Sequence, residues 1–160
     1  MSYELNKINL IDDKKSFRIR YCGVNKILLN IENIYSPFGI EKYNNKDILN
    51  LVLTAETNEN YNSIVLIKQL DNYFKNLHES KKELNNLSYT SPIKIISDNK
   101  IQIRTHLAKK INIKSDNQQN IEIKNKKCII ELEFSSIWIY NQNYGIVLTV
   151  NMIDLTRNCH

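Results

Sequence analysis

Hydrophobic and polar residues alternate along residues 128–154 in a pattern that predicts two β-strands. Ile130, Leu132 and Phe134 alternate with glutamates, and a similar alternation resumes after a short polar stretch. A period of two places successive side chains on opposite faces of a strand, so one face of each strand is expected to be buried. The polar stretch predicts a hairpin with a loop longer than the tight two-residue type, in which Gly145 supplies a positive φ.

Shorter runs elsewhere in the chain have the apolar alternation or β-branched enrichment of strands. The first fifteen residues show no such pattern and give no prediction. A polar loop at residues 115–120 separates two apolar runs and predicts a second hairpin. The predicted strands are residues 17–21, 27–34, 48–53, 93–96 and 101–104, with residues 111–113 and 121–123 as the arms of the second hairpin.

One helix is predicted, over residues 61–82. Apolar side chains recur there at spacings of three and four residues, with charged residues on the opposite side. Asn60 or Asn62 is expected to cap its start, because a short polar side chain can accept a hydrogen bond from the first turn. We expect the apolar face to pack on the core of the protein rather than to form a groove for a partner.

The order of strands, one amphipathic helix and further strands predicts a mainly β fold. A small β-barrel with a helix inserted after its third strand is the oligonucleotide/oligosaccharide-binding (OB) arrangement. The alternative is a β-sandwich with a packed helix. A chain of 160 residues with 42% hydrophobic content is long enough for one core, so residues 1–160 are expected to form a single domain.

Composition narrows the setting in which the protein is expected to work. No apolar run approaches the roughly 20 residues that span a bilayer, and the N-terminus has no signal-peptide pattern. A cytoplasmic protein without a membrane partner is therefore expected. The three cysteines have neither the number of a disulfide framework nor the spacing of a zinc site, so no cofactor is predicted. The 24 Asn, 25 Ile and 18 Lys residues indicate an A+T-rich coding sequence.

Positive charge is concentrated in one segment. Residues 100–127 contain eight Lys and Arg residues against two acidic ones, whereas the preceding 99 residues are nearly balanced. A basic segment beside strands that carry aromatic residues is typical of a nucleic-acid-binding protein. A solvated lysine-rich loop is the alternative, and the A+T-rich coding bias could by itself supply the lysines.

Two pairs of short motifs resemble a known family. Residues 35–43 (YSPFGIEKY) are followed by residues 48–51 (ILNL), and residues 138–140 (WIY) by residues 144–146 (YGI). These segments resemble single-stranded-DNA-binding proteins of yeast cytoplasmic linear plasmids and of large cytoplasmic DNA viruses. The resemblance implies an OB-like barrel that binds and protects single strands during replication in the cytoplasm. It leaves the role of the basic segment open.

Binding of single strands with little sequence specificity needs aromatic rings on which bases stack and cations along the phosphate backbone. Phe38 and Trp138 are equally consistent with core packing, whereas Tyr43 and Tyr144 lie in polar turns and are expected to be exposed. Arg18 and Arg20 are weaker candidates for phosphate contacts. The candidate nucleic-acid-binding residues are Tyr35, Phe38, Tyr43, Arg104, His106, Lys109, Lys110, Trp138, Tyr140 and Tyr144.

Catalysis has little support in the sequence. A nuclease could place metal-binding carboxylates on strands, but Glu131 and Glu133 are expected on a solvent face, and the histidines have no ligand spacing. The predicted function is therefore non-enzymatic, with single-stranded DNA as the partner, RNA as an alternative, and replication proteins or a second copy of the chain as further partners. The competing hypothesis is a β-rich interaction module of a replication or transcription complex, because Tyr and Trp are also favoured at protein interfaces. The carboxylates considered for a metal site are Asp12, Asp13, Glu131, Glu133 and Asp154.

Overall fold

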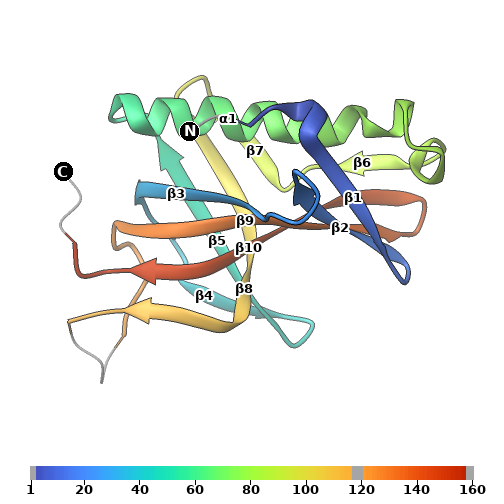
Figure 1. Cartoon of the computed structure of the whole chain (residues 1–160). Helices are drawn as coiled ribbons and strands as arrows, with labels where there is room; N and C mark the ends of the chain where they lie inside the picture. Colours follow the sequence, from blue (N-terminus) through green and yellow to red (C-terminus); the bar gives the residue numbers. More distant parts are fainter. Residues whose placement is uncertain (1–2, 117–120, 158–160) are drawn as a thin grey trace.

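The computed structural model describes residues 3–116 and 121–157, and within them the chain is mainly β with one α-helix, as the sequence predicted (Figure 1). The strands are β1 (Ile8–Asp13), β2 (Ser16–Tyr21), β3 (Ile27–Ile34), β4 (Ile40–Tyr43), β5 (Lys46–Thr54), β6 (Ser88–Thr90), β7 (Ile93–Ser97), β8 (Lys100–Lys114), β9 (Cys128–Tyr140) and β10 (Asn143–Asp154). The helix is α1 (Asn58–Lys75), and the 3-10 helices are Leu5–Lys7, Asn76–Glu79 and Lys82–Leu84.

All ten strands belong to one sheet. Its main hydrogen-bonded path has the order β1-β2-β9-β10-β8-β5-β4, while β3, β6 and β7 pair with β9, β10 and β8, respectively. Most pairs are antiparallel, but β10 runs parallel to both β6 and β8.

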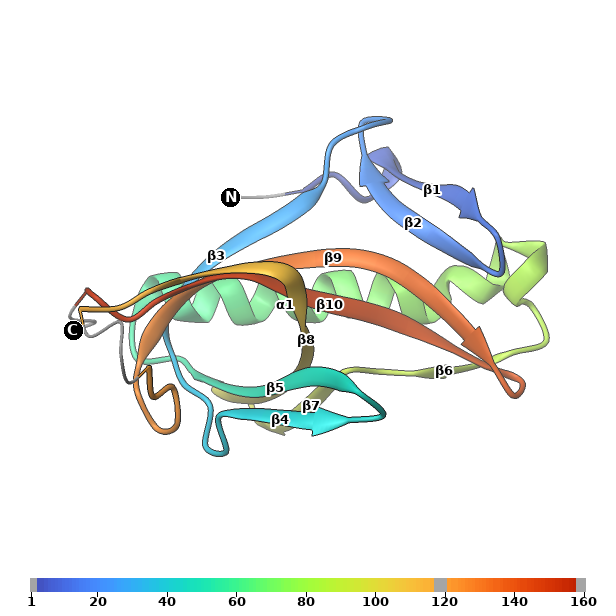
Figure 2. The same ribbon diagram turned by 90° about the horizontal axis from the view of Figure 1, so that it is seen from below.

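β8 takes part in two layers of this sheet. Its first half pairs with β5, and its second half pairs with β10. Figure 2 shows the bend in β8 and the two layers that it joins. The layers also approach each other at one antiparallel bridge between Tyr35, just after β3, and Val52 in β5.

The expected OB-like barrel is therefore found only in part. The sheet curls strongly, but a single bridge links the β3 and β5 sides, and no continuous ladder closes the described strands into a barrel. The alternative sandwich is not formed either, because a sandwich has two separate sheets and the ten described strands share one.

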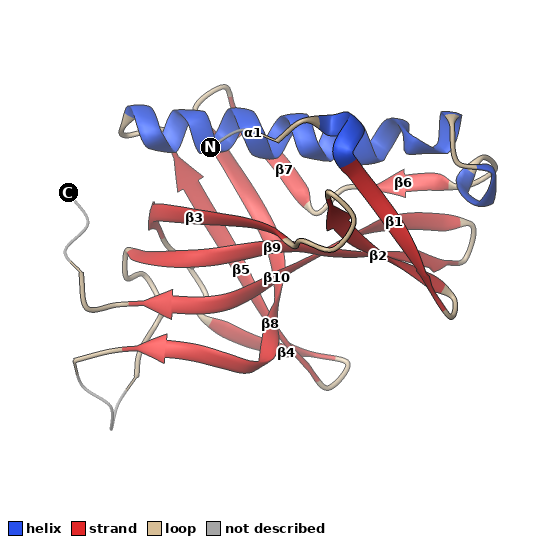
Figure 3. Ribbon diagram, in the orientation of Figure 1, coloured by secondary structure: helices blue, strands red, loops and turns tan. Residues whose placement is uncertain are grey.

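α1 lies along one side of the sheet and covers the core (Figure 3). Ile64, Ile67, Leu70 and Phe74 are buried, which confirms that its apolar face packs on the core. The expected cap was wrong, because the side chain of Thr57 accepts the hydrogen bond from the backbone N–H three residues on. No helix in the described part of the chain is long and apolar enough to cross a bilayer.

The hairpin of β9 and β10 is confirmed, but its turn differs from the prediction. Only Asn141 and Gln142 connect the strands, and both have positive φ, of 49° and 63°. A two-residue turn with positive φ at both positions matches the twist of the flanking strands. Gly145 is not part of the turn and lies inside β10, opposite Trp138.

The predicted second hairpin is wrong. Residues 111–113 continue β8, and Asn112 and Ile113 pair with β10, whereas residues 121–123 are not in a strand. The polar loop between these runs includes residues 117–120, which lie outside the described part. The short strands β1, β4 and β6 were not predicted. β4 has a single aliphatic residue and β6 has none, which leaves too little apolar pattern to detect.

Candidate nucleic-acid interface

Trp138 and Tyr144 lie on opposite faces of the hairpin of β9 and β10. Trp138 pairs with Gly145, and Ile139 pairs with Tyr144, so the register places the two aromatic side chains on alternate faces. Tyr144 is fully buried, and its hydroxyl donates to the carbonyl oxygens of Phe74 and Lys75, both at 2.8 Å. The expectation that Tyr144 is exposed was therefore wrong, and its ring belongs to the core beneath α1.

The indole of Trp138 lies directly over the backbone of Gly145. A Cβ atom at position 145 would be 2.6 Å from Trp138 Cζ2 and 2.6 Å from the carbonyl oxygen of Thr90. No side chain fits in that space, so glycine at this position lets the ring pack against the backbone of β10. Trp138 is half-buried as a result, with part of its ring at the surface.

We expect Gly145→Ala to destabilise the protein by about 1 to 3 kcal/mol, because the new methyl group must displace the indole ring or the Thr90 backbone. Urea unfolding measures the stability, and the emission maximum of Trp138 reports the displacement. Gly23→Ala is the control, since Gly23 has a φ of 93° but no atom within 4 Å of an added Cβ. That control should lose stability through backbone strain alone and leave the emission unchanged. An unchanged emission in Gly145→Ala would contradict the packing described above.

Across from Trp138, the turn between β4 and β5 carries Tyr43 and Lys46. Asn44 and Asn45 form this turn with φ values of 51° and 62°, a conformation that asparagine adopts more readily than most residues. Tyr43 is 59% exposed, and the guanidinium carbon of Arg104 lies 5.2 Å from the centre of its ring. This distance is within the range of a cation–π contact.

His106 lies two residues after Arg104 on β8, so both side chains are on the same face of the strand. Partial burial lowers the pKa of His106, and the positive charges of Lys46 and Arg104 lower it further. The imidazole is therefore largely neutral near pH 7. A phosphate placed among these three groups would be attracted to the cations and would favour protonation of His106.

The segment between β6 and β7 lies beside Trp138 and is joined to α1 by hydrogen bonds. The carboxylate of Asp71 accepts hydrogen bonds from the hydroxyls of Tyr89, at 2.5 Å, and Ser91, at 2.8 and 2.9 Å. Burial raises the pKa of Tyr89, and the negative charge of Asp71 raises it further, so the phenol remains a donor. These bonds hold Thr90 and Pro92 in place beside Trp138.

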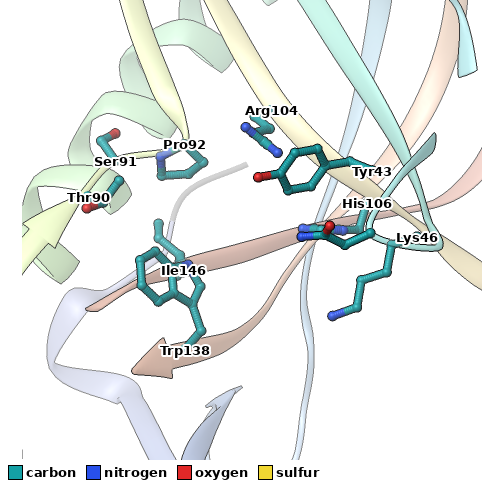
Figure 4. A pocket seen from close by; sticks show the side chains of 10 residues that line it. Tyr43, Lys46, Thr90, Ser91, Pro92, Arg104, His106, Trp138 and Ile146 are labelled. Atoms are coloured by element: carbon teal, nitrogen blue, oxygen red, sulfur yellow. The ribbon is translucent and has the colours of Figure 1, made fainter. Parts of the chain in front are cut away.

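Together these segments enclose a cleft of about 320 Å³ (Figure 4). The close-up shows the Trp138 ring on one side and Tyr43, Arg104 and His106 on the other. None of the described residues that line the cleft is acidic. The lining residues are Tyr43, Asn44, Lys46, Thr90, Ser91, Pro92, Arg104, His106, Trp138 and Ile146.

Comparison with known proteins gives a structural likeness but no sequence family. No protein-family model matches the chain, and no curated protein sequence matches it. The fold is similar to that of gp2.5, a single-stranded DNA binding protein encoded by bacteriophage T7. The TM-score is 0.50 with 9% sequence identity, over 84% of this chain and 90% of gp2.5. At this identity the likeness concerns the fold alone.

Four of the predicted site residues meet in the cleft, namely Tyr43, Arg104, His106 and Trp138. Tyr140 lies at the end of β9 and is 71% exposed, on the same face as Trp138 because it follows it by two residues.

The other candidates do not line the cleft. Phe38 is 60% exposed in the bend before β4 and lies apart from it. Tyr35 is half-buried and pairs with β5. Lys109 and Lys110 are exposed in an irregular part of β8, where its pairing with β10 shifts register.

Several residues of the cleft were missed by the sequence analysis. Lys46 follows Tyr43 by three residues, and the sequence analysis placed Tyr43 in a polar turn, so the position of Lys46 beside Tyr43 was available as a signal. Ser91, Pro92 and Ile146 belong to segments with no charged or aromatic pattern of their own, and only the tertiary structure brings them to Trp138.

The carboxylates considered for a metal site are dispersed. Glu133 is buried instead of solvent-exposed, and its Oε1 accepts a hydrogen bond of 3.0 Å from Asn151. Asp154 is buried in β10, where hydrogen bonds from Thr156 lower its pKa. Asp12 and Asp13 lie at the end of β1. Among residues 3–116 and 121–157, no group of three or more His, Cys, Asp or Glu side chains could hold a metal ion.

Proposed function

We propose that the protein binds single-stranded DNA without enzymatic activity and with little sequence specificity. The observation that carries this proposal is the cleft in which an indole ring faces Tyr43 across a space lined by Lys46, Arg104 and His106. Stacking on an aromatic ring suits any base, and the cations suit the phosphates that accompany it.

Each side of the cleft has a distinct role in this proposal. Trp138 supplies the stacking surface, because its ring packs against the backbone at Gly145, lines the cleft and is only half-buried. Lys46 and Arg104 bind phosphate oxygens, and His106 adds a hydrogen bond. A duplex keeps its bases stacked on each other, so it cannot offer a base to Trp138 without local opening. The cleft therefore favours single strands.

The shared fold with gp2.5, which is a single-stranded DNA binding protein, supports the proposal. We extend the proposal to protection of single strands that are exposed during replication in the cytoplasm. The motifs around Tyr35 and Trp138 resemble those of single-stranded-DNA-binding proteins of linear plasmids and large DNA viruses, which replicate in this setting. Replication proteins are the protein partners that this setting implies.

Fluorescence of Trp138 during titration with oligo(dT) tests the proposal, with duplex DNA of equal phosphate count and oligo(U) as comparisons. Trp138 is the only tryptophan, so quenching reports directly on the cleft. We expect strong quenching by oligo(dT) and weaker quenching by duplex. The logarithm of the affinity should fall linearly with the logarithm of the salt concentration, with a slope of about −0.7 per phosphate contacted.

Absence of binding to oligo(dT) at low salt would overturn the proposal. Equal binding of duplex and single strand would contradict the stacking role of Trp138. Tighter binding of oligo(U) would make RNA the preferred partner.

A protein-interaction module is the second candidate, and one feature of β7 favours it. Ile95 and Ile96 are adjacent, 61% and 49% exposed, on a strand that pairs only with β8 among the described strands. An exposed apolar edge strand can pair with a partner chain. This function would become the leading one if oligo(dT) does not bind.

A further inference from the structure

β2 lies beside β9 on the side away from the cleft, and its register with β9 places Arg18 on the face that carries Trp138. Phe17 pairs with Ile137, and both are buried in the core. Arg18 pairs with Ser136. Because successive residues alternate between faces, Arg18 and Ser136 lie on the outer face, and Trp138, two residues along β9, lies there too.

This register also fixes how far Arg18 is from Trp138. Trp138 follows Ser136 by two positions, so Arg18 is its diagonal neighbour, and diagonal neighbours are about 7 to 8 Å apart. Figure 2 shows β2 alongside β9, with β10 on the other side of β9. Arg18 is therefore within reach of a nucleotide whose base lies on the Trp138 ring.

The guanidinium of Arg18 is only weakly held. Its side chain is 49% exposed and its Nε atom lies 3.8 Å from Asp13 Oδ2, on a carboxylate that is itself 49% exposed. Ion pairs at this exposure contribute little, because water and salt screen them. Arg20, the next residue of β2 on this face, donates from Nη1 to the carbonyl oxygen of Ile19 and is half-buried. Arg18 is thus the more available cation of the two.

A base stacked on Trp138 has a phosphate on each side along the strand. Lys46 and Arg104 lie on the side of β8 and the β4–β5 turn, while Arg18 lies on the side of β2. Two strand-to-strand steps of about 4.8 Å separate β2 from β10. Cations therefore flank the indole ring on both sides.

Resting on the proposed function, we infer that the hairpin of β1 and β2 is the second half of the binding surface. Arg18 binds the phosphate on the far side of the base that stacks on Trp138. The single strand then crosses β2, β9 and β10 and enters the cleft, instead of ending at Trp138. Asp13 competes with the phosphate for Arg18 and weakens binding.

Two variants of opposite expected effect test this inference by titration with oligo(dT). Arg18→Ala should reduce the magnitude of the salt slope by about 0.7. The ratio of wild-type affinity to variant affinity should therefore be about fivefold larger at 0.1 M salt than at 1 M salt. Asp13→Asn should strengthen binding, because it releases Arg18 and removes a negative charge. Arg18→Lys should keep the wild-type slope. Lys75→Ala is the matched control, since Lys75 is an exposed cation on α1, on the other side of the sheet, and should not change the slope.

The two variants also separate a phosphate contact from a structural role of the ion pair. If the pair only stabilises the hairpin, Asp13→Asn and Arg18→Ala should both weaken binding. A wild-type slope in Arg18→Ala, with oligo(dT) still quenching Trp138 in the wild-type protein, would overturn this inference and leave the proposed function intact. Failure of the wild-type protein to bind oligo(dT) would instead overturn the proposed function. Circular dichroism of each variant confirms that the sheet has formed.

Discussion

Trp138→Ala should weaken the binding of oligo(dT) by about 5- to 150-fold while leaving the protein folded. Stacking of one base on an aromatic side chain contributes about 1 to 3 kcal/mol, which corresponds to this range of affinity. The ring is half-buried on the surface of the sheet, over Gly145, so its removal opens no cavity in the core. Because the variant has no tryptophan, anisotropy of a labelled oligonucleotide is the suitable measurement.

Two further variants test whether the loss of oligo(dT) affinity comes from the missing aromatic ring in the cleft. Trp138→Phe keeps an aromatic ring and should retain most of the affinity. Tyr61→Ala removes an exposed aromatic ring from α1, on the other side of the sheet, and should bind as the wild type does. If Trp138→Ala binds oligo(dT) with wild-type affinity, the indole is not a stacking surface and the cleft has another use.

Tyr144→Ala should destabilise the protein by about 3 to 5 kcal/mol, which is the usual cost of removing a large aromatic side chain from a core. Tyr144 is fully buried and tilts against Tyr89, with 5.1 Å between the ring centres. Tyr144→Phe should cost about 0.5 to 1.5 kcal/mol, because it removes the hydrogen bonds that the hydroxyl donates to Phe74 and Lys75. The loss is small because the backbone N–H of Asn76 still donates to the Phe74 carbonyl and His78 Nδ1 lies 2.8 Å from the Lys75 carbonyl. Urea unfolding followed by circular dichroism measures both losses.

Tyr140→Phe is the matched control, since it removes a tyrosine hydroxyl from the exposed end of the same hairpin and should not change the unfolding midpoint. A Tyr144→Ala variant that keeps wild-type stability but loses DNA binding would restore Tyr144 as a surface residue, contrary to the structure.

The sequence predicted which residues form strands better than it predicted which strands pair with each other. Alternation in residues 128–154 reports which side chains are buried, and β9 and β10 follow it closely. The alternation does not indicate which other strands pair with β9 and β10. Residues 111–113 have the same kind of alternation, yet Asn112 and Ile113 pair in parallel with β10, and the segment does not fold back on residues 121–123. That choice depends on contacts between distant segments, which no local pattern contains.

The candidate site was likewise predicted as single residues and not as an arrangement in space. The sequence supplied Tyr43, Arg104, His106 and Trp138 as separate candidates, because aromatic and basic side chains have a recognisable chemistry. It could not show that they surround one cleft, since they come from β4, β8 and β9. Tyr144 was misplaced for a more local reason. Its polar neighbours indicated a turn, but a turn of only two residues placed it within β10, facing the core.

The position of β10 in the sheet has a consequence for biosynthesis. β10 lies between β9 and β8 and also pairs with β6, and all three strands precede it in the chain. A nascent chain that has emerged only as far as β9 therefore lacks the strand that pairs with both β8 and β9. Until residues 143–154 leave the ribosome, the edges of β8 and β9 have unpaired backbone groups, which is the condition in which β-rich chains aggregate. We expect nascent chains arrested before β10 to depend on chaperones, and the sheet to form only after translation has passed this strand.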